Sequence, residues 1–357
     1  MAAYTTIDDS SAFFKVQLYT GNGSDNHAIT FDDTDTDMAP KLVWIKNRDS
    51  TDVNCIFDSN RGATEFLYTG EISGGRAEID DDDTLDSFTS DGFQVDDDDR
   101  VNTNAEKYVS WNWKGGTTSG IDATGADITP SSYSFSQDAG ISILLYTGNG
   151  SADQKVAHGL GAIPDLMLVK SVSSNDDWIS FHKDMHADDP EDYTMSIGDT
   201  SARYNASYAW NDTMPTSVFY TVNNSDAGNK SGGEMVGYCF KGKQGFSKFG
   251  GYTGNGDADG VFIYLGFRPA YLTIWNADSA GSNKYIFDNK RLGYNIDNNR
   301  IDMNTTAAEG TDDRLDFLSN GFKVRNTGNP NTATLWIYAA FAEAPFVNSN
   351  GVPGCAK

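Results

Sequence analysis

The chain has 357 residues, with 26 lysine and arginine residues against 51 aspartate and glutamate residues, and a formal net charge of −25. Such an acidic surface repels nucleic acid and anionic membranes, so a nucleic-acid-binding role is excluded. Hydrophobic residues make up 38% of the chain and aromatic residues 12%, a composition that excludes disorder and predicts packed cores.

Neither membrane insertion nor export is expected from the sequence. No run approaches the roughly 18 apolar residues of a membrane span. Residues 1–11 have neither the basic region nor the apolar core of a signal peptide, so synthesis in a reducing cytoplasm is expected. The cysteines, Cys55, Cys239 and Cys355, have no disulfide-framework or metal-site spacing, and Cys55 and Cys239 are expected to be buried thiols.

A five-residue string, Tyr-Thr-Gly-Asn-Gly, occurs three times, at Tyr19–Gly23, Tyr146–Gly150 and Tyr252–Gly256. The copies begin 127 and 106 residues apart. This spacing is too long for a solenoid repeat of roughly 20–50 residues, and it matches the size of a compact domain. The chain therefore reads as three copies of one domain.

Each string is followed by a proline and then by a short apolar run that predicts a strand. Apolar and β-branched residues bounded by Gly, Pro, Asn and Asp are typical of strands, and a proline suits a strand's first residue. The runs are residues 42–46, 166–170 and 271–275. A second shared segment, Ile56–Arg61 in copy 1 and Ile286–Arg291 in copy 3, is degraded to residues 180–184 in copy 2.

Two hairpins are predicted further along copies 1 and 3. Asp91-Gly92 and Asn320-Gly321 stand between apolar residues, and both pairs tolerate the positive φ that a tight hairpin needs. Copy 2 has no clear counterpart, so it is the most diverged copy.

Each copy closes with an aromatic-rich strand, at residues 108–114, 235–241 and 335–341. Trp111 and Trp113 alternate with polar residues, which predicts a half-buried strand. Counting from each opening tyrosine aligns Trp111, Tyr238 and Tyr338 as the central aromatic residues.

These patterns predict an all-β fold of three tandem antiparallel β-sandwich domains, of jelly-roll or lectin-like type. The predicted organisation is an N-terminal assembly segment (1–16), repeat 1 (17–116), a linker (117–140), the diverged repeat 2 (141–243), repeat 3 (244–346) and a C-terminal tail (347–357).

Two acidic runs, residues 80–83 and 96–99, flank the first predicted hairpin. Their favoured interpretation is solvated surface acid, because calcium needs six to eight oxygens from a shaped loop. The alternative is a weak Ca²⁺ or Mg²⁺ site, for which the candidate ligands are Asp80, Asp82, Asp97 and Asp99. No other cofactor is expected.

Nothing in the motifs argues for catalysis, since no nucleophile elbow, phosphate loop or dinucleotide fingerprint appears, and the chain is not expected to be an enzyme. The closing-strand aromatic residues are expected to pack in cores. Trp178, Tyr208 and Trp210 in copy 2 are candidate glycan contacts, because sugars stack on exposed aromatic rings.

Read together, the motifs resemble a family of virion structural proteins from tailed phages, especially marine and cyanobacterial phages. The resemblance covers nearly the whole chain. It identifies the family but does not specify a role within the virion. It rests on the opening string, on residues 42–48, 57–63, 90–93 and 111–116, and on the C-terminal segments 341–349 and 351–353.

The resemblance implies a non-enzymatic structural protein on the particle exterior, in a tail fibre, an appendage or a capsid decoration. It would be made in the host cytoplasm and assembled into the virion with other virion proteins, and a homo-oligomer is expected. The alternative is a receptor-recognising, carbohydrate-binding module of the tail that contacts host-surface glycan. No catalytic or ligand residue is carried over by these motifs.

Overall fold

The computed structural model describes residues 4–31, 36–70, 77–291, 295 and 297–353. Antiparallel strands dominate these residues, which confirms the predicted all-β fold. The helices of this part of the chain are short: η1 (Ser10–Ala12), α1 (Asp99–Asn102), η2 (Pro190–Asp192), α2 (Ser207–Trp210) and α3 (Asp226–Asn229). Among the residues described here, no helix is long and apolar enough to cross a membrane.

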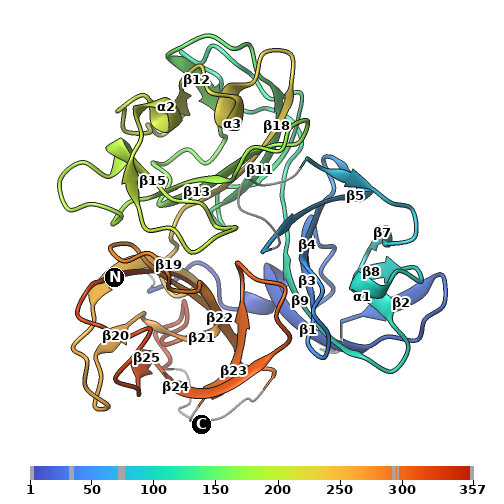
Figure 1. Cartoon of the computed structure of the whole chain (residues 1–357), viewed down its shortest axis with the longest axis vertical. Coiled ribbons are helices and arrows are strands. Elements are labelled where there is room, and N and C mark those ends of the chain that lie inside the picture. The colour runs from blue at the N-terminus through green and yellow to red at the C-terminus, as the bar shows by residue number, and fades with distance from the viewer. Residues whose placement is uncertain (1–3, 32–35, 71–76, 292–294, 296, 354–357) are drawn as a thin grey trace.

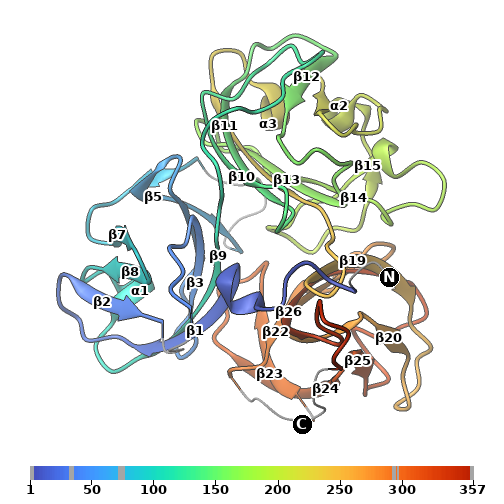
Figure 2. The same cartoon turned by 180° about the vertical axis from the view of Figure 1, so that it is seen from behind.

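Among the described residues, strands pair within three successive stretches of the chain, which we call lobe 1 (residues 14–113), lobe 2 (132–240) and lobe 3 (247–345). The lobes surround a common centre rather than following one another in a line (Figures 1 and 2). Part of the predicted terminal segments, residues 1–3 and 354–357 with Cys355, lies outside the described residues.

Lobe 1 consists of a six-stranded sheet and a three-stranded sheet. The larger has the order β1 (Phe14–Thr20), β9 (Lys107–Trp113), β3 (Leu42–Asn47), β4 (Asn54–Asp58), β5 (Gly62–Thr69), β6 (Ile79–Asp80). The smaller has the order β2 (His27–Thr30), β8 (Gly92–Val95), β7 (Leu85–Thr89).

Lobe 2 has one five-stranded sheet and two strand pairs. The sheet has the order β10 (Ser132–Ser136), β11 (Ile141–Thr147), β18 (Glu234–Phe240), β13 (Leu166–Ser171), β14 (Ile179–His182). The pairs are β12 (Gln154–Ala157) with β17 (Phe219–Val222), and β15 (Tyr193–Thr194) with β16 (Tyr204–Asn205).

Lobe 3 winds eight strands into one strongly curved sheet. Their order is β19 (Ser247–Thr253), β26 (Leu335–Pro345), β21 (Phe267–Asn276), β22 (Tyr285–Asp288), β23 (Asp297–Asp302), β24 (Gly310–Leu318), β25 (Gly321–Val324), β20 (Phe262–Tyr264).

The same four-stranded arrangement recurs in every lobe. The strand that carries the Tyr-Thr-Gly-Asn-Gly string pairs with the closing strand, which pairs with the apolar-run strand and then its hairpin partner. These sets are β1-β9-β3-β4, β11-β18-β13-β14 and β19-β26-β21-β22. Both predicted hairpins form, as β7–β8 closing at Thr89 and Gly92 and as β24–β25 closing at Leu318 and Gly321. Their turns are Ser90-Asp91 and Ser319-Asn320, one residue earlier than predicted, because each glycine is already the first residue of the second strand.

The prediction that the closing strand is half-buried is wrong for lobe 1. Tyr108 to Trp113 of β9 are all buried. In the adjacent strand β3, Trp44 belongs to a cluster shared by all three lobes, whereas Val43 and Ile45 belong to the core of lobe 1 itself. The sheet is therefore covered on one face by its own lobe and on the other by the neighbouring lobes.

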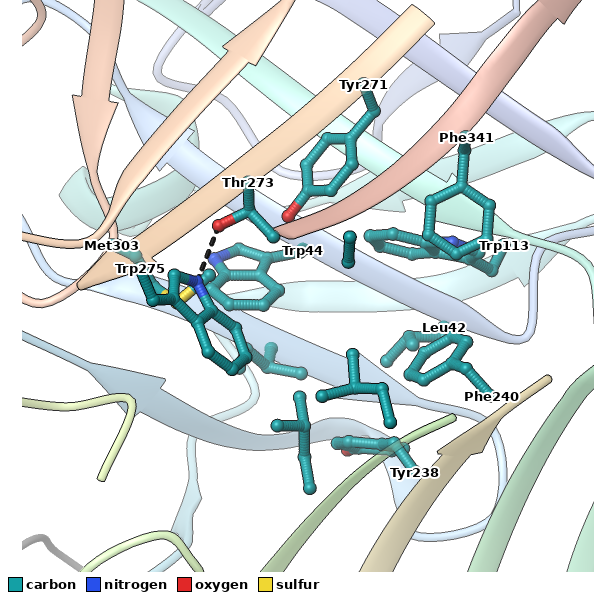
Figure 3. Close-up of a pocket in the computed structure, with 14 residues that line it drawn as sticks. Leu42, Trp44, Trp113, Tyr238, Phe240, Tyr271, Thr273, Trp275, Met303 and Phe341 are labelled. Carbon is teal, nitrogen blue, oxygen red and sulfur yellow. Dashed lines mark hydrogen bonds between the residues drawn. The ribbon is translucent and has the colours of Figure 1, made fainter. Parts of the chain in front are cut away.

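The three sheets meet at an apolar junction, shown in Figure 3, which encloses a cavity of about 30 Å³. Every lobe contributes large side chains to its wall, among them Trp44, Trp113, Phe240, Tyr271 and Phe341. Trp113, Tyr271 and Phe341 pack ring against ring, with centroids 5.6 to 6.1 Å apart. The lobes thus share one hydrophobic core, and their relative placement is part of the fold.

Candidate functional site

The repeated string forms a hydrogen-bonded clasp at the end of its strand. In lobe 2 the buried side chain of Asn229 accepts from the backbone N–H of Asn149 at 2.9 Å. Its Nδ2 donates to Asn149 Oδ1 and to the Ser151 carbonyl, at 3.1 and 2.7 Å. The same three bonds recur around Asn102 in lobe 1 and Asn331 in lobe 3.

The two glycines of the string are required by this geometry. A Cβ on Gly148 would lie 2.3 Å from the Lys230 carbonyl oxygen, and Gly150 has φ +68°. The string is therefore explained by local structure and not by a ligand. The clasp asparagines were not predicted, although they follow the string's own asparagine by 80, 80 and 76 residues.

Backbone hydrogen bonds link the lobes in a closed cycle. At each interface an N–H of one lobe donates to the carbonyl just beyond the apolar-run strand of the next. The pairs are Glu78 to Val172 (lobe 1 to 2, 2.9 Å), Arg203 to Ala277 (2 to 3, 2.9 Å) and Glu309 to Arg48 (3 to 1, 2.8 Å). Equivalent positions are used each time, so the chain is a pseudo-threefold ring.

Two of the interfaces also contain a buried ion pair that receives a bond from a neighbouring lobe. Arg61 Nε donates to Asp58 Oδ2 at 2.6 Å, with side chains 1% and 0% exposed. Tyr238 of lobe 2 donates its hydroxyl to the same Asp58 oxygen at 2.7 Å. A buried charge pair is tolerated when its remaining hydrogen-bonding capacity is satisfied, and the neighbouring lobe contributes to this here.

The equivalent position in lobe 2 is His182, which pairs with Leu166 as Asp58 pairs with Leu42. Its Nε2 lies 3.2 Å from the Tyr338 carbonyl oxygen of lobe 3. The strand register places Ala339 at the position of Tyr238. Counting from the opening tyrosine had predicted Tyr338 for this position, which is wrong by one residue. The opening tyrosines pair with Tyr108, Met235 and Trp336, and the aligned residue lies three positions after each partner, which gives Ala339 in lobe 3.

The acidic runs converge only in part. Asp81, Asp82 and Asp83 offer carboxylate oxygens within 4.8 Å of one another. Asp82 is thus the one predicted ligand in this group, whereas Asp80, Asp97 and Asp99 lie exposed outside it. Partial desolvation and the neighbouring Asp97 and Asp82 carboxylates raise the pKa of Asp83. These carboxylates repel one another, and Arg100 pairs with Asp81 at 2.7 Å.

The three candidate glycan contacts differ in how far they are buried. Trp178 is 2% exposed and Trp210 1% exposed, and both rings are packed in cores, so neither can stack on a sugar. That part of the prediction is corrected: polar sequence neighbours suggested loops, but both indoles fill the interior. Tyr208 is 38% exposed, and its hydroxyl lies 2.5 Å from that of Tyr204.

A groove of about 450 Å³ lies where residues 241–246 connect lobes 2 and 3. Its lining brings together segments that are far apart in the chain, and the N-terminal segment forms one wall. Lining residues are Tyr4, Asp165, Lys183, Lys241, Gly242, Gln244, Ser247, Lys248, Phe249, Tyr264 and Leu265. The sequence analysis had named none of these as a site residue.

Tyr264 and the lysines give the groove its chemical character. Tyr264 is 47% exposed, and Lys248 Nζ lies 5.6 Å from its ring centroid. Lys241 is paired with Asp165 at 3.0 Å. The Tyr4 hydroxyl donates to the Gly266 carbonyl at 3.0 Å, and burial together with Tyr264 raises the pKa of Tyr4 to about 12.

A family model described as a domain of unknown function (DUF7483) matches residues 9–345. The match spans all three lobes. No curated protein and no solved structure matches the chain.

Proposed function

The chain belongs to the DUF7483 family, whose description assigns no function, and from this premise we propose that it is a non-enzymatic structural protein of a tailed-phage virion. It is exposed on the particle exterior, in a tail fibre, an appendage or a capsid decoration. The motif resemblance supplies the virion setting. The observation that carries a structural role is the closed cycle of inter-lobe bonds around one apolar junction.

This arrangement suits a rigid building block. Moving lobe 1 out of the ring would expose aromatic rings of the junction and break its bonds at both interfaces, those at Val172 and Arg48. The acidic surface keeps such a block soluble at high local concentration. Other virion proteins and further copies of the chain are its proposed partners.

We also propose that the lobes are β-sandwiches of jelly-roll or lectin type. In lobe 1, Val43 and Phe57 of the larger sheet share a core with Phe93 and Val95 of the smaller one. In lobe 2, Met167 similarly shares a core with residues of the β12–β17 pair. Face-to-face packing of this kind is the defining feature of a sandwich.

Immunogold labelling of purified particles tests the virion role. An antibody raised against the chain is expected to label intact particles, on the tail or over the head. Label on the tail would assign an appendage, and label spread over the head would assign a decoration. Presence in the lysate of infected cells but absence from purified particles, in an immunoblot with the same antibody, would contradict the proposal.

A second function, recognition of a host glycan by a tail-borne module, is favoured by one observation. The groove between lobes 2 and 3 combines a half-exposed aromatic ring with cationic and amide side chains, which is the composition of a saccharide site.

A further inference from the structure

We propose that the groove between lobes 2 and 3 binds an anionic saccharide, with a sugar ring against Tyr264 and its acid group between Lys183 and Lys248. The inference rests on the second proposed function, glycan recognition, and it specifies the site and the class of ligand. It does not depend on where in a virion the chain sits.

The charge of the groove is opposite to that of the molecule. A chain of net charge −25 places Lys183, Lys241 and Lys248 around one cavity whose lining contains a single aspartate, Asp165. Asp165 is already neutralised, because it accepts from Lys241 at 3.0 Å and from the Gly242 N–H at 2.8 Å. The lining therefore has an excess of positive charge.

Lys248 is placed to receive an anion. Its Nζ donates to a neutral acceptor, the Tyr264 carbonyl, at 2.6 Å. Desolvation and the nearby charge of Lys183 lower the pKa of Lys248. Lys183 has a partly exposed partner, Asp184, at 3.5 Å. A carboxylate or sulfate between the two lysines would relieve their repulsion and form charge-assisted hydrogen bonds.

The remaining lining fits a sugar better than a bare anion. The Tyr264 ring offers an apolar face of the kind on which sugar rings stack, and Gln244 is exposed beside it with an amide that can bond hydroxyl groups. The volume of about 450 Å³ lies within the range of about 300–1,000 Å³ that is usual for small-ligand pockets. Buried Phe249 contributes to the apolar part of the lining.

Isothermal titration of the purified full-length chain tests the proposal. The probes are a trigalacturonate, a sulfated galactan tetrasaccharide and neutral maltotriose. We expect saturable binding of at least one anionic probe, weakening as salt is added, with little binding of maltotriose. The two anionic probes distinguish a carboxylate from a sulfate ligand.

Variants locate the site. Lys183→Gln, Lys248→Gln and Tyr264→Ala are each expected to weaken binding by about tenfold or more. Lys107→Gln, which removes an exposed charge on lobe 1, and Tyr208→Ala, at the surface tyrosine pair, are expected to leave the affinity unchanged. Thermal unfolding of each variant verifies that it is folded.

Three results would overturn the proposal: no saturable binding of either anionic probe, unchanged affinity in the groove variants, or loss of affinity in Tyr208→Ala alone. Lysine-dependent binding of a hexaglutamate peptide that survives Tyr264→Ala, without saccharide binding, would also overturn it in favour of an acidic protein segment. None of these results would alter the particle labelling, so the virion role stands or falls separately.

Discussion

Trp111 in lobe 1 donates its indole N–H to the carboxylate of Asp288 in lobe 3, at 3.1 Å. Tyr238 in lobe 2 makes the equivalent contact with Asp58 in lobe 1. Both carboxylates are fully buried, and both are paired with an arginine three residues further along. Each contact therefore joins two lobes through a buried carboxylate, whose negative charge is stabilised by the hydrogen bonds that it accepts.

We expect Tyr238→Phe to lower the free energy of unfolding by about 1–2 kcal/mol, because Asp58 loses a donor inside a dry interface. Asp58→Asn is expected to lower the free energy of unfolding further, because the buried Arg61 then keeps Glu78 but loses the carboxylate of Asp58. In urea unfolding, the double variant should cost less than the sum of the single variants. Strict additivity would show that the two side chains are not energetically coupled.

The third interface lacks both members of this pair. Ala339 occupies the position of Trp111 and Tyr238, and His182 occupies that of the two aspartates. The two differences are physically linked, because a buried aspartate opposite Ala339 would lack the hydrogen-bond donor that Trp111 or Tyr238 supplies at the other interfaces. The small side chain of Ala339 also borders the central cavity.

Filling that cavity is expected to stabilise the protein. Ala339→Val adds two methyl groups to the cavity wall. It should raise the free energy of unfolding by about 0.5–1 kcal/mol, seen as a higher urea midpoint. Ala340→Val is the matched control, because Ala340 is also buried in the same strand but does not line the cavity. The volume added there should lower the free energy of unfolding by about 1–3 kcal/mol. Equal losses in both variants would show that the junction cannot accept more volume.

The strands and hairpins were predictable because their signals are local. The apolar runs, the glycine-containing hairpin segments at residues 90–92 and 319–321 and the repeated string each specify a short piece of backbone. Both buried thiols, Cys55 and Cys239, were also expected from their apolar neighbours and are confirmed. In these segments local propensity and final structure agree.

The ring and the groove were not predictable, because each depends on residues far apart in the chain. Tyr238 and Asp58 are separated by 180 residues. Closure of the ring is also why β9 is buried on both faces, although its alternation suggested one exposed face. The burial of Trp178 depends on contact across lobes, since its indole N–H donates to the Tyr68 carbonyl of lobe 1.

The clasps at the ends of the string strands are expected to matter for stability. Asn229→Ala removes three side-chain hydrogen bonds and leaves the Asn149 N–H short of an acceptor, so we expect a loss of about 2–3 kcal/mol in urea unfolding. Asn224→Ala is the control, because Asn224 is exposed and lies two residues before α3 begins. A similarly small effect of both changes would contradict a structural role for the clasp.

Buried histidines should make the protein sensitive to acid. Burial lowers the pKa of His182 from 6.5 to about 4, an effect that outweighs the opposing influence of Asp184. Burial has the same effect on His158. Between pH 4 and 6.5 the unfolded chain binds more protons than the folded one. The histidines' contribution to the free energy of unfolding is therefore complete above about pH 6.5 and is lost as the pH falls toward 4.

Each histidine contributes at most roughly 3 kcal/mol to this loss. His182→Gln can still donate toward the Tyr338 carbonyl but does not titrate, so its urea midpoint should depend less on pH between 6.5 and 4 than that of the wild type. If the urea midpoint of His182→Gln depended on pH as steeply as that of the wild type, His182 would take up its proton in the folded state. The interface between lobes 2 and 3 would then have to accommodate the charged ring.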